Sequence, residues 1–355
     1  MKNLLKLLSP FAPDQSGAAA VLYELGGLMV ICDAGGCAGN VCGFDEPRWF
    51  TKKSAVFSAG LRDMDAILGR DDRLIEKLSK ACGQISPAFT AIIGTPVPAV
   101  IATDMRALKR MAEKKTGLPC ITAECTGTNY YDSGSEPVWI ELFKTFATES
   151  KPVQKGRLGI IGATPLELGI ISPERIAEEY KAKGWENVIC YGMGSTLDDV
   201  KNAAAAEMNI VCSAAAIKAA EYLKEKFGTP YEIEYPRSCL SEEIVQKADN
   251  FTDKNVLVIH NQIAADAVRK LITEKSGKCR CTSATFFMQK KELSQQSDFF
   301  LADESDLCDN VGDNYDVVIA DKTLRRVMKN FSGEFIDFPH FGLSGRLLQG
   351  ESEKI

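Results

Sequence analysis

The chain has 355 residues, of which 45% are hydrophobic and 25% charged, and its formal net charge is -6 at pH 7. This length exceeds one compact core and indicates two or three globular domains, and the acidic balance argues against nucleic acid or anionic lipid as a partner. No run approaches the roughly 18 apolar residues of a membrane span, and Met1–Leu8 is short for a signal sequence, so we expect a cytoplasmic protein without membrane partners.

Short apolar runs recur along the chain, and each is followed by a segment of helix length. The runs span residues 28–35, 55–60, 89–95, 119–125, 157–164, 188–193, 209–213, 255–260 and 316–321. Apolar strands that alternate with helices are typical of parallel sheets covered on both faces, and this spacing is that of repeated βαβ units. We therefore predict an α/β fold of three Rossmann-like parallel-sheet domains. Polar segments at residues 151–155 and 248–254 place the domains at 1–152, 153–250 and 251–355.

The loop that follows the first predicted strand concentrates glycine and cysteine. Residues 33–43 read DAGGCAGNVCG and stand at the carboxyl end of a parallel strand, where ligands bind in open α/β sheets. An iron–sulfur cluster needs thiolates and close backbone approach, which glycine permits. A phosphate-binding loop with incidental cysteines is the alternative, but the glycines fit neither common nucleotide motif. The candidate residues are Gly35, Gly36, Gly39, Cys37 and Cys42, with Cys32 in reserve.

The total of twelve cysteines favours metal or redox chemistry over a disulfide framework in a cytoplasmic chain. Cys190 and Cys212 lie inside apolar runs, where free cysteine is usually a small core residue.

From residue 11 onward the sequence resembles nitrogenase component 1 and its relatives, including the reductases that act on tetrapyrroles. Residues 11–37 match the family's first segment in length and hydrophobic pattern, and Gly36-Cys37 falls on the Gly-Cys of its cluster loop. Further similar stretches follow in the family's order, at residues 58–74, 94–105, 157–163, 192–210, 221–235 and 316–345.

Departures from the family pattern limit what this resemblance implies. Of the three cysteine positions that hold the family's larger cluster, Phe11 and Thr95 occupy two and only Cys37 remains, so we expect no eight-iron cluster. The positions that hold the catalytic metallocofactor fall at Ser213 and Pro339.

Cys212 and His340 each lie one residue from these two positions, and a one-residue slip in a strand reverses the face of a side chain. We therefore expect no metallocofactor and no reduction of dinitrogen, although a register change would bring Cys212 and His340 back.

The resemblance implies one [4Fe–4S] cluster shared by two identical or homologous subunits, with Cys37 and Cys42 from each. Two-fold dimers are the commonest oligomers. A cluster within one chain, held by Cys120 and Cys125, is the alternative. The resemblance instead assigns Glu124 and Cys125 to the wall of the cofactor cavity, which makes both candidate cofactor-binding residues, and Cys125 is a reserve cluster ligand beside Cys32.

His340 is the candidate proton donor, because imidazole titrates near neutrality and the resemblance places this C-terminal segment beside the interdomain cavity. His260 reads as structural. Three arginines could hold substrate carboxylates: Arg237, Arg325 and Arg346.

These observations predict an oxidoreductase subunit. It would pass low-potential electrons from a separate P-loop iron–sulfur ATPase, through the cluster, to a small molecule in the interdomain cavity, such as a tetrapyrrole. Two alternatives stay open, a scaffold or carrier for metal-cofactor assembly and a cluster-free α/β protein that binds a small molecule.

Overall fold

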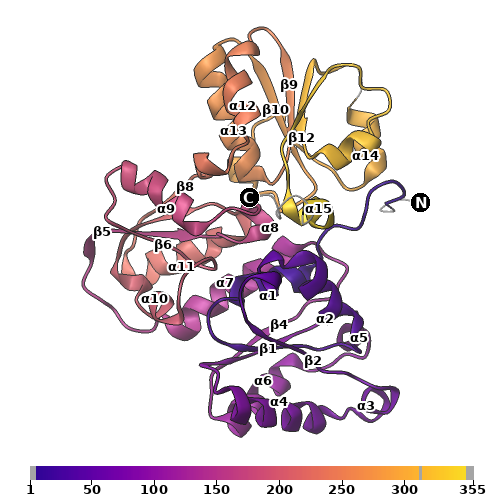
Figure 1. Ribbon diagram of the computed structural model, residues 1–355, viewed down its shortest axis with the longest axis vertical. Helices are drawn as coiled ribbons and strands as arrows, with labels where there is room; N and C mark the ends of the chain where they lie inside the picture. Colours follow the sequence, from indigo (N-terminus) through magenta and orange to yellow (C-terminus); the bar gives the residue numbers. More distant parts are fainter. Residues whose placement is uncertain (1–4, 312–313, 349–355) are drawn as a thin grey trace.

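The computed structural model describes residues 5–311 and 314–348 and contains three parallel sheets, each with helices packed on it (Figure 1). The predicted α/β fold with three parallel-sheet units is confirmed. Among the described residues, no helix is both long enough and apolar enough to cross a membrane.

The first sheet has the strand order β2-β1-β3-β4, with all neighbours parallel. Because the chain crosses from β2 past β1 to β3, the strand order reverses between β1 and β3, and such a switch point opens a crevice at the carboxyl ends of the strands. The strands are β1 (Leu28–Ile31), β2 (Ala55–Ser58), β3 (Thr90–Ile93) and β4 (Cys120–Ala123). The helices are α1 (Asp14–Leu22), α2 (Gly36–Asn40), α3 (Asp63–Leu68), α4 (Asp71–Ile85), α5 (Pro96–Val100), α6 (Met105–Thr116) and α7 (Tyr131–Phe146).

The second sheet has the order β6-β5-β7-β8, again parallel throughout. Its strands are β5 (Gln154–Ile161), β6 (Asn187–Cys190), β7 (Ala206–Val211) and β8 (Tyr231–Ile233). Its helices are α8 (Pro165–Leu168), α9 (Pro173–Ala182), α10 (Leu197–Lys201) and α11 (Ile217–Phe227). The inner strands β5 and β7 are apolar on both faces toward their carboxyl ends because helices cover both sides of the sheet.

The third sheet has the order β11-β10-β9-β12-β13. Its strands are β9 (Asn255–Ile259), β10 (Arg280–Thr285), β11 (Phe299–Phe300), β12 (Val317–Ala320) and β13 (Glu334–Asp337). The helices of this part of the chain are α12 (Glu242–Lys247), α13 (Gln262–Ser276), α14 (Glu304–Asn310) and α15 (Phe341–Leu348). Helix α12 precedes β9 in the chain and packs against β13, so the third unit includes residues that come before β9. The domain boundaries at residues 152 and 250 stay a prediction.

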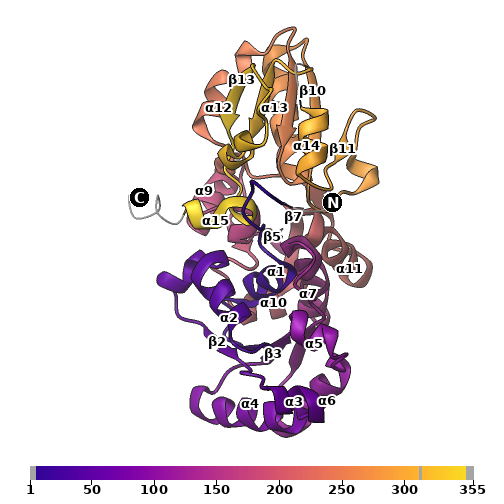
Figure 2. The ribbon, with the colours of Figure 1, turned by 90° about the vertical axis from the view of Figure 1, so that its right-hand side faces the viewer.

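The three units meet around α7 and α15. Helix α7 packs on α1 of the first unit and on α11 of the second, and α15 returns from the third unit to contact α8 (Figures 1 and 2). The N-terminal segment joins the first and third units, because Glu304 Oε1 accepts hydrogen bonds from the backbone N–H groups of residues 6–8 at 2.7–2.8 Å. The ends of the chain therefore help to position the junction between the units.

Candidate functional site

The predicted glycine–cysteine loop lies at the switch point of the first sheet. After β1 the chain turns at Gly35, whose φ of 129° is strained for any residue with a Cβ, and enters α2 and a π-helical turn at Val41–Asp45. Asp33 holds this turn in place, because its carboxylate accepts hydrogen bonds from Ala38 N at 2.7 Å and from Ser58 Oγ at 2.5 Å. Together with Gly36 and Gly39, Gly35 is exposed, so the backbone is open to a ligand here.

Cys37 is half-buried at the edge of this crevice. Burial and the charge of Asp33 raise the pKa of its thiol, while a hydrogen bond with the Thr95 hydroxyl acts in the opposite direction. The Thr95 hydroxyl donates to Cys32 O at 2.8 Å, and Thr95 is fully buried just after β3. Thr95, which is predicted to occupy a family cysteine position, thus lies beside Cys37.

Cys42 has a different environment. Its side chain is 9% exposed, and burial together with the charge of Glu46 raises its pKa to about 11. Its thiol lies near the Tyr23 hydroxyl and Glu46, whereas that of Cys37 lies near Thr95 and Asp33. The two thiols therefore lie in different electrostatic environments.

The reserve candidates are less accessible. Cys32 and Cys125 are both buried, and burial raises the pKa of Cys32 to about 12 and that of Cys125 further. Cys120 begins β4, whose strand spans roughly 10 Å, and Cys125 lies after a turn in which its N–H donates to Ala123 O. The two cysteines thus lie at opposite ends of β4, which argues against a cluster shared by them within one chain. Exposed Glu124 lines a cavity of about 380 Å³ with Cys125.

Within the described residues, no group of three or more His, Cys, Asp or Glu side chains could hold a metal ion. A cluster at the loop would therefore need ligands from a second chain. Helices α2, α3 and α5 lie on the same, right-hand side of the first unit in Figure 1. The exposed apolar residues on α3, on α5 and in the turns that directly follow α2 and α5 are Phe44, Met64, Ile67, Leu68, Val97, Val100 and Ile101.

A second site, which the sequence did not reveal, lies where the three units meet. Glu167 on α8 is buried, with Ser213 Oγ hydrogen-bonded to Oε1 and the Tyr131 hydroxyl 3.0 Å from Oε2. Burial, with a further contribution from the charge of Asp132, raises the pKa of Glu167 to about 8. Glu167 is therefore mostly a neutral carboxylic acid at pH 7. Its position as a lone acid in an apolar segment (ATPLELG) is the only signal the sequence carried.

His340, the predicted proton donor, belongs to the same network. Its Nε2 lies 2.9 Å from the Tyr131 hydroxyl, and its ring stacks on His260 at 4.2 Å between centroids. Burial lowers the pKa of both histidines, that of His260 to about 4, so both are neutral. The strand period does not decide the direction of this side chain, because His340 follows β13 instead of lying in it.

Cys212 follows β7 and is fully buried, with its Sγ 3.3 Å from Ile161 O, whereas Ser213 Oγ is hydrogen-bonded to Glu167. Burial, together with the charge of Glu167, raises the pKa of the Cys212 thiol.

A cavity of about 240 Å³ lies between the glycine–cysteine loop and the junction. Its wall combines the N-terminal segment at residues 7–13 with Asn40 and Asp45 of the loop, Arg326 of the third unit and Phe341 of α15. Of the predicted carboxylate-binding arginines, Arg237 and Arg325 are exposed and do not line it, and the side chain of Arg346 lies outside the described residues.

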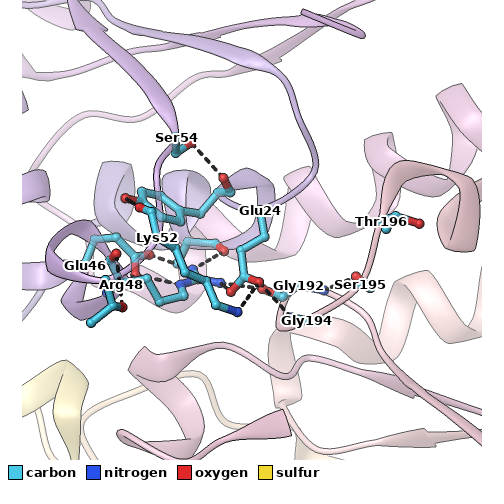
Figure 3. A network of polar contacts seen from close by, with 12 residues as sticks. Glu24, Glu46, Arg48, Lys52, Ser54, Gly192, Gly194, Ser195 and Thr196 are labelled. Carbon is cyan, nitrogen blue, oxygen red and sulfur yellow. Dashed lines mark hydrogen bonds and ion pairs between the residues drawn. The ribbon is translucent and has the colours of Figure 1, made fainter. Parts of the chain in front are cut away.

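Arg48 connects the segment after the loop to the second unit (Figure 3). Its guanidinium group donates to both oxygens of Glu46, to Glu24 Oε1 at 3.0 Å, to Ala20 O at 2.8 Å and to Gly192 O at 2.5 Å.

Glu24 extends this network in two directions. It accepts hydrogen bonds from Lys52 Nζ at 2.7 Å and from Gly194 N at 2.9 Å. Arg48 and Glu24, both largely buried, therefore connect the segment after the cysteine-bearing loop to the loop that follows β6.

Comparison with known proteins identifies the family. Residues 14–236 match the model of the nitrogenase component 1 type oxidoreductases. The chain belongs to this family. The iron-molybdenum cofactor biosynthesis protein NifE of Clostridium pasteurianum is 24% identical over 224 residues, which cover 58% of this chain and 48% of that protein. NifE of Klebsiella pneumoniae is 26% identical over 222 residues, which cover 55% and 46%. The chain thus spans about half the length of these relatives.

Solved structures agree on the fold. The structure described as nitrogenase Cp1 at pH 6.5 superposes with a TM-score of 0.69 at 13% identity, over 99% of this chain and 93% of that one. Nitrogenase Cp1 at pH 5 gives a TM-score of 0.59 at 13% identity, over 99% and 80%. The predicted nitrogenase component 1 fold is confirmed.

Proposed function

We propose that this family member is an oxidoreductase subunit that delivers low-potential electrons to a small molecule other than dinitrogen. The electrons would come from a separate P-loop iron–sulfur ATPase and pass through a [4Fe–4S] cluster shared by two identical or homologous subunits. The observation that carries the proposal is Cys37, a half-buried thiol at the switch point of the first sheet, in a loop that resembles the family's cluster loop.

The loop supports a shared cluster better than one held by a single chain. Cys37 is partly accessible beside exposed glycines, and α3 and α5, on the same side of the first unit, carry exposed apolar residues that a second subunit would cover. Cys42 stays the proposed second ligand, provided that the π-helical turn rearranges to release its thiol. When bound, the cluster would supply one-electron transfer. The Thr95 hydroxyl would then lie beside the ligand sulfur of Cys37.

The cavity of about 240 Å³ beside the loop is the proposed substrate site. It is smaller than the roughly 300–1,000 Å³ of typical ligand pockets, which favours a compact substrate. A tetrapyrrole would require α15 and the N-terminal segment to move apart. Dinitrogen is excluded from the proposal because Ser213 and the inward-facing Glu167 replace the thiol that the metallocofactor needs.

Iron binding tests this proposal. We expect the protein, purified without oxygen, to be brown and to contain about four irons per pair of chains. Cys37→Ala should remove the iron, whereas Cys190→Ala, which changes a buried thiol of the second unit, should keep it. Colourless, iron-free protein after anaerobic reconstitution would contradict every cluster-based function and leave a cluster-free small-molecule-binding protein.

A scaffold for metal-cofactor assembly is the second candidate, and the names of both NifE relatives favour it. The two roles differ in their coupling to ATP. An oxidoreductase subunit should show oxidation of its reduced cluster only as substrate is consumed, with electrons supplied by the ATPase. A scaffold should instead accept a preformed metal cluster and release it to another protein without substrate turnover.

A further inference from the structure

The network at the junction of the three units has the features of a switch. We propose that Glu167 is a proton-controlled latch, whose neutral carboxyl group holds the three units together and whose ionisation loosens them. This inference does not depend on the proposed electron transfer, because it concerns the protein without any bound group.

Each unit contributes one member to the hydrogen-bonded chain. Tyr131 begins α7 of the first unit, Glu167 lies on α8 of the second, and His340 precedes α15 of the third. The Tyr131 hydroxyl contacts both of the others, at 3.0 Å to Glu167 Oε2 and 2.9 Å to His340 Nε2. All three side chains are at most 4% exposed, so water does not replace these contacts in the closed state.

The hydrogen bonds around Glu167 supply no positive charge. Ser213 Oγ and the Tyr131 hydroxyl donate to its two carboxyl oxygens, and the Tyr131 oxygen lies 2.9 Å from Nε2 of His340. Both donors are neutral hydroxyl groups, so burial favours the protonated form of Glu167.

Ionisation would leave Glu167 without a compensating cation. The groups that influence its charge are Ser213 and Tyr131, which hydrogen-bond to it, and Asp132, which repels a negative charge. The other titratable groups packed around it are neutral when buried, and comprise Cys212, Tyr235, His260 and His340. A buried carboxylate without an ion partner is costly, and opening the junction to water removes that cost.

The sign of the pH effect follows from linkage. A carboxyl group whose pKa rises on closing, here from 4.5 to about 8, stabilises the closed state fully at low pH. That stabilisation is lost as the pH rises through about 8. The equilibrium constant for opening should therefore rise about tenfold per pH unit between about pH 5 and 8 and level off above.

Opening would also change the proposed substrate cavity. Phe341 and Gly342, which directly follow His340, line this cavity, and Gly342 O accepts a hydrogen bond from Ala12 N at 2.8 Å. Release of His340 from Tyr131 would free the start of α15, so the latch controls how wide the cavity is.

Hydrogen exchange of backbone amides in α8 and at residues 340–343 tests the latch. After correction for the intrinsic pH dependence of exchange, protection should fall about tenfold per pH unit from pH 5 to 8 and then level off. Amides of α4, on the far side of the first unit, should show no such slope (Figure 1). Wild-type protein with equal protection across this range would overturn the proposal.

Two substitutions assign the slope to Glu167. Glu167→Gln keeps a hydrogen-bond donor and an acceptor in a side chain of the same shape, so the variant should fold. Its protection from exchange should not depend on pH and should equal the protection of the wild-type protein at low pH. Asp132→Asn removes a repelling charge, so the levelling point should move to lower pH. If the protection of Glu167→Gln still falls with pH, another group carries the effect. The same holds if protection in Asp132→Asn levels off at the same pH as in the wild-type protein.

Discussion

Arg48→Met is expected to lower the free energy of unfolding by about 3–5 kcal/mol, the usual cost of removing one partner from a buried ion pair. The Arg48 side chain is 8% exposed and that of Glu46 2%, and the guanidinium group also satisfies the carbonyls of Ala20 and Gly192. Methionine fills similar space but leaves Glu46 without its cation and the two carbonyls without this donor, whereas Glu24 keeps Lys52. Urea unfolding followed by circular dichroism would measure the loss.

Lys52→Met is the matched control. Lys52 also pairs with Glu24, at 2.7 Å, but its side chain is 46% exposed. Solvent screens such a pair, so the substitution should cost no more than about 1 kcal/mol. Equal losses for Arg48→Met and Lys52→Met would mean that burial does not set the strength of this network. Adding Glu46→Gln to Arg48→Met should recover part of the loss, because it removes one uncompensated charge.

Gly134→Ala is expected to be severely destabilising, at or above the upper end of the 1–3 kcal/mol typical of overpacking. A Cβ at this position on α7 would lie 1.9 Å from Asp14 O on α1, and one at Gly17 on α1 would lie 1.8 Å from Tyr131 O. Both neighbours are backbone atoms, so the helices themselves would have to separate. The thermal midpoint and the near-ultraviolet circular dichroism would report the change.

Gly83→Ala provides the control within a helix. Gly83 lies in α4 with nothing within 4 Å of an added Cβ. Alanine is a better helix former than glycine, so this substitution should stabilise the protein by about 0.5–1 kcal/mol. If Gly134→Ala were equally harmless, the close crossing of α1 and α7 would not exist in the folded protein.

The sequence alone determined much of the architecture. Runs such as residues 28–35 and 255–260 predicted buried parallel strands, because a strand covered on both faces is apolar throughout. The order of matched segments indicated the family, which the comparison then showed. These inferences succeeded because they rest on local patterns or on the linear order of segments.

The candidate site was only partly predictable. The glycine–cysteine loop does lie at a sheet switch point, but the separate environments of Cys37 and Cys42 depend on Thr95, which is far away in the chain. Equal C-x4-C spacings looked equivalent in sequence, yet Cys120 and Cys125 lie at opposite ends of a strand.

The sequence by itself therefore determined the fold, the family and the cysteine-bearing loop, because each depends on residues that are near one another in the chain. Only the tertiary structure revealed the Arg48 network and the latch at Glu167. Arg48 and Gly192 are 144 positions apart, and Tyr131 and His340 are 209 positions apart. The protonation state and the partners of these buried groups depend on how the three sheets pack together. A local pattern of residues does not predict that packing.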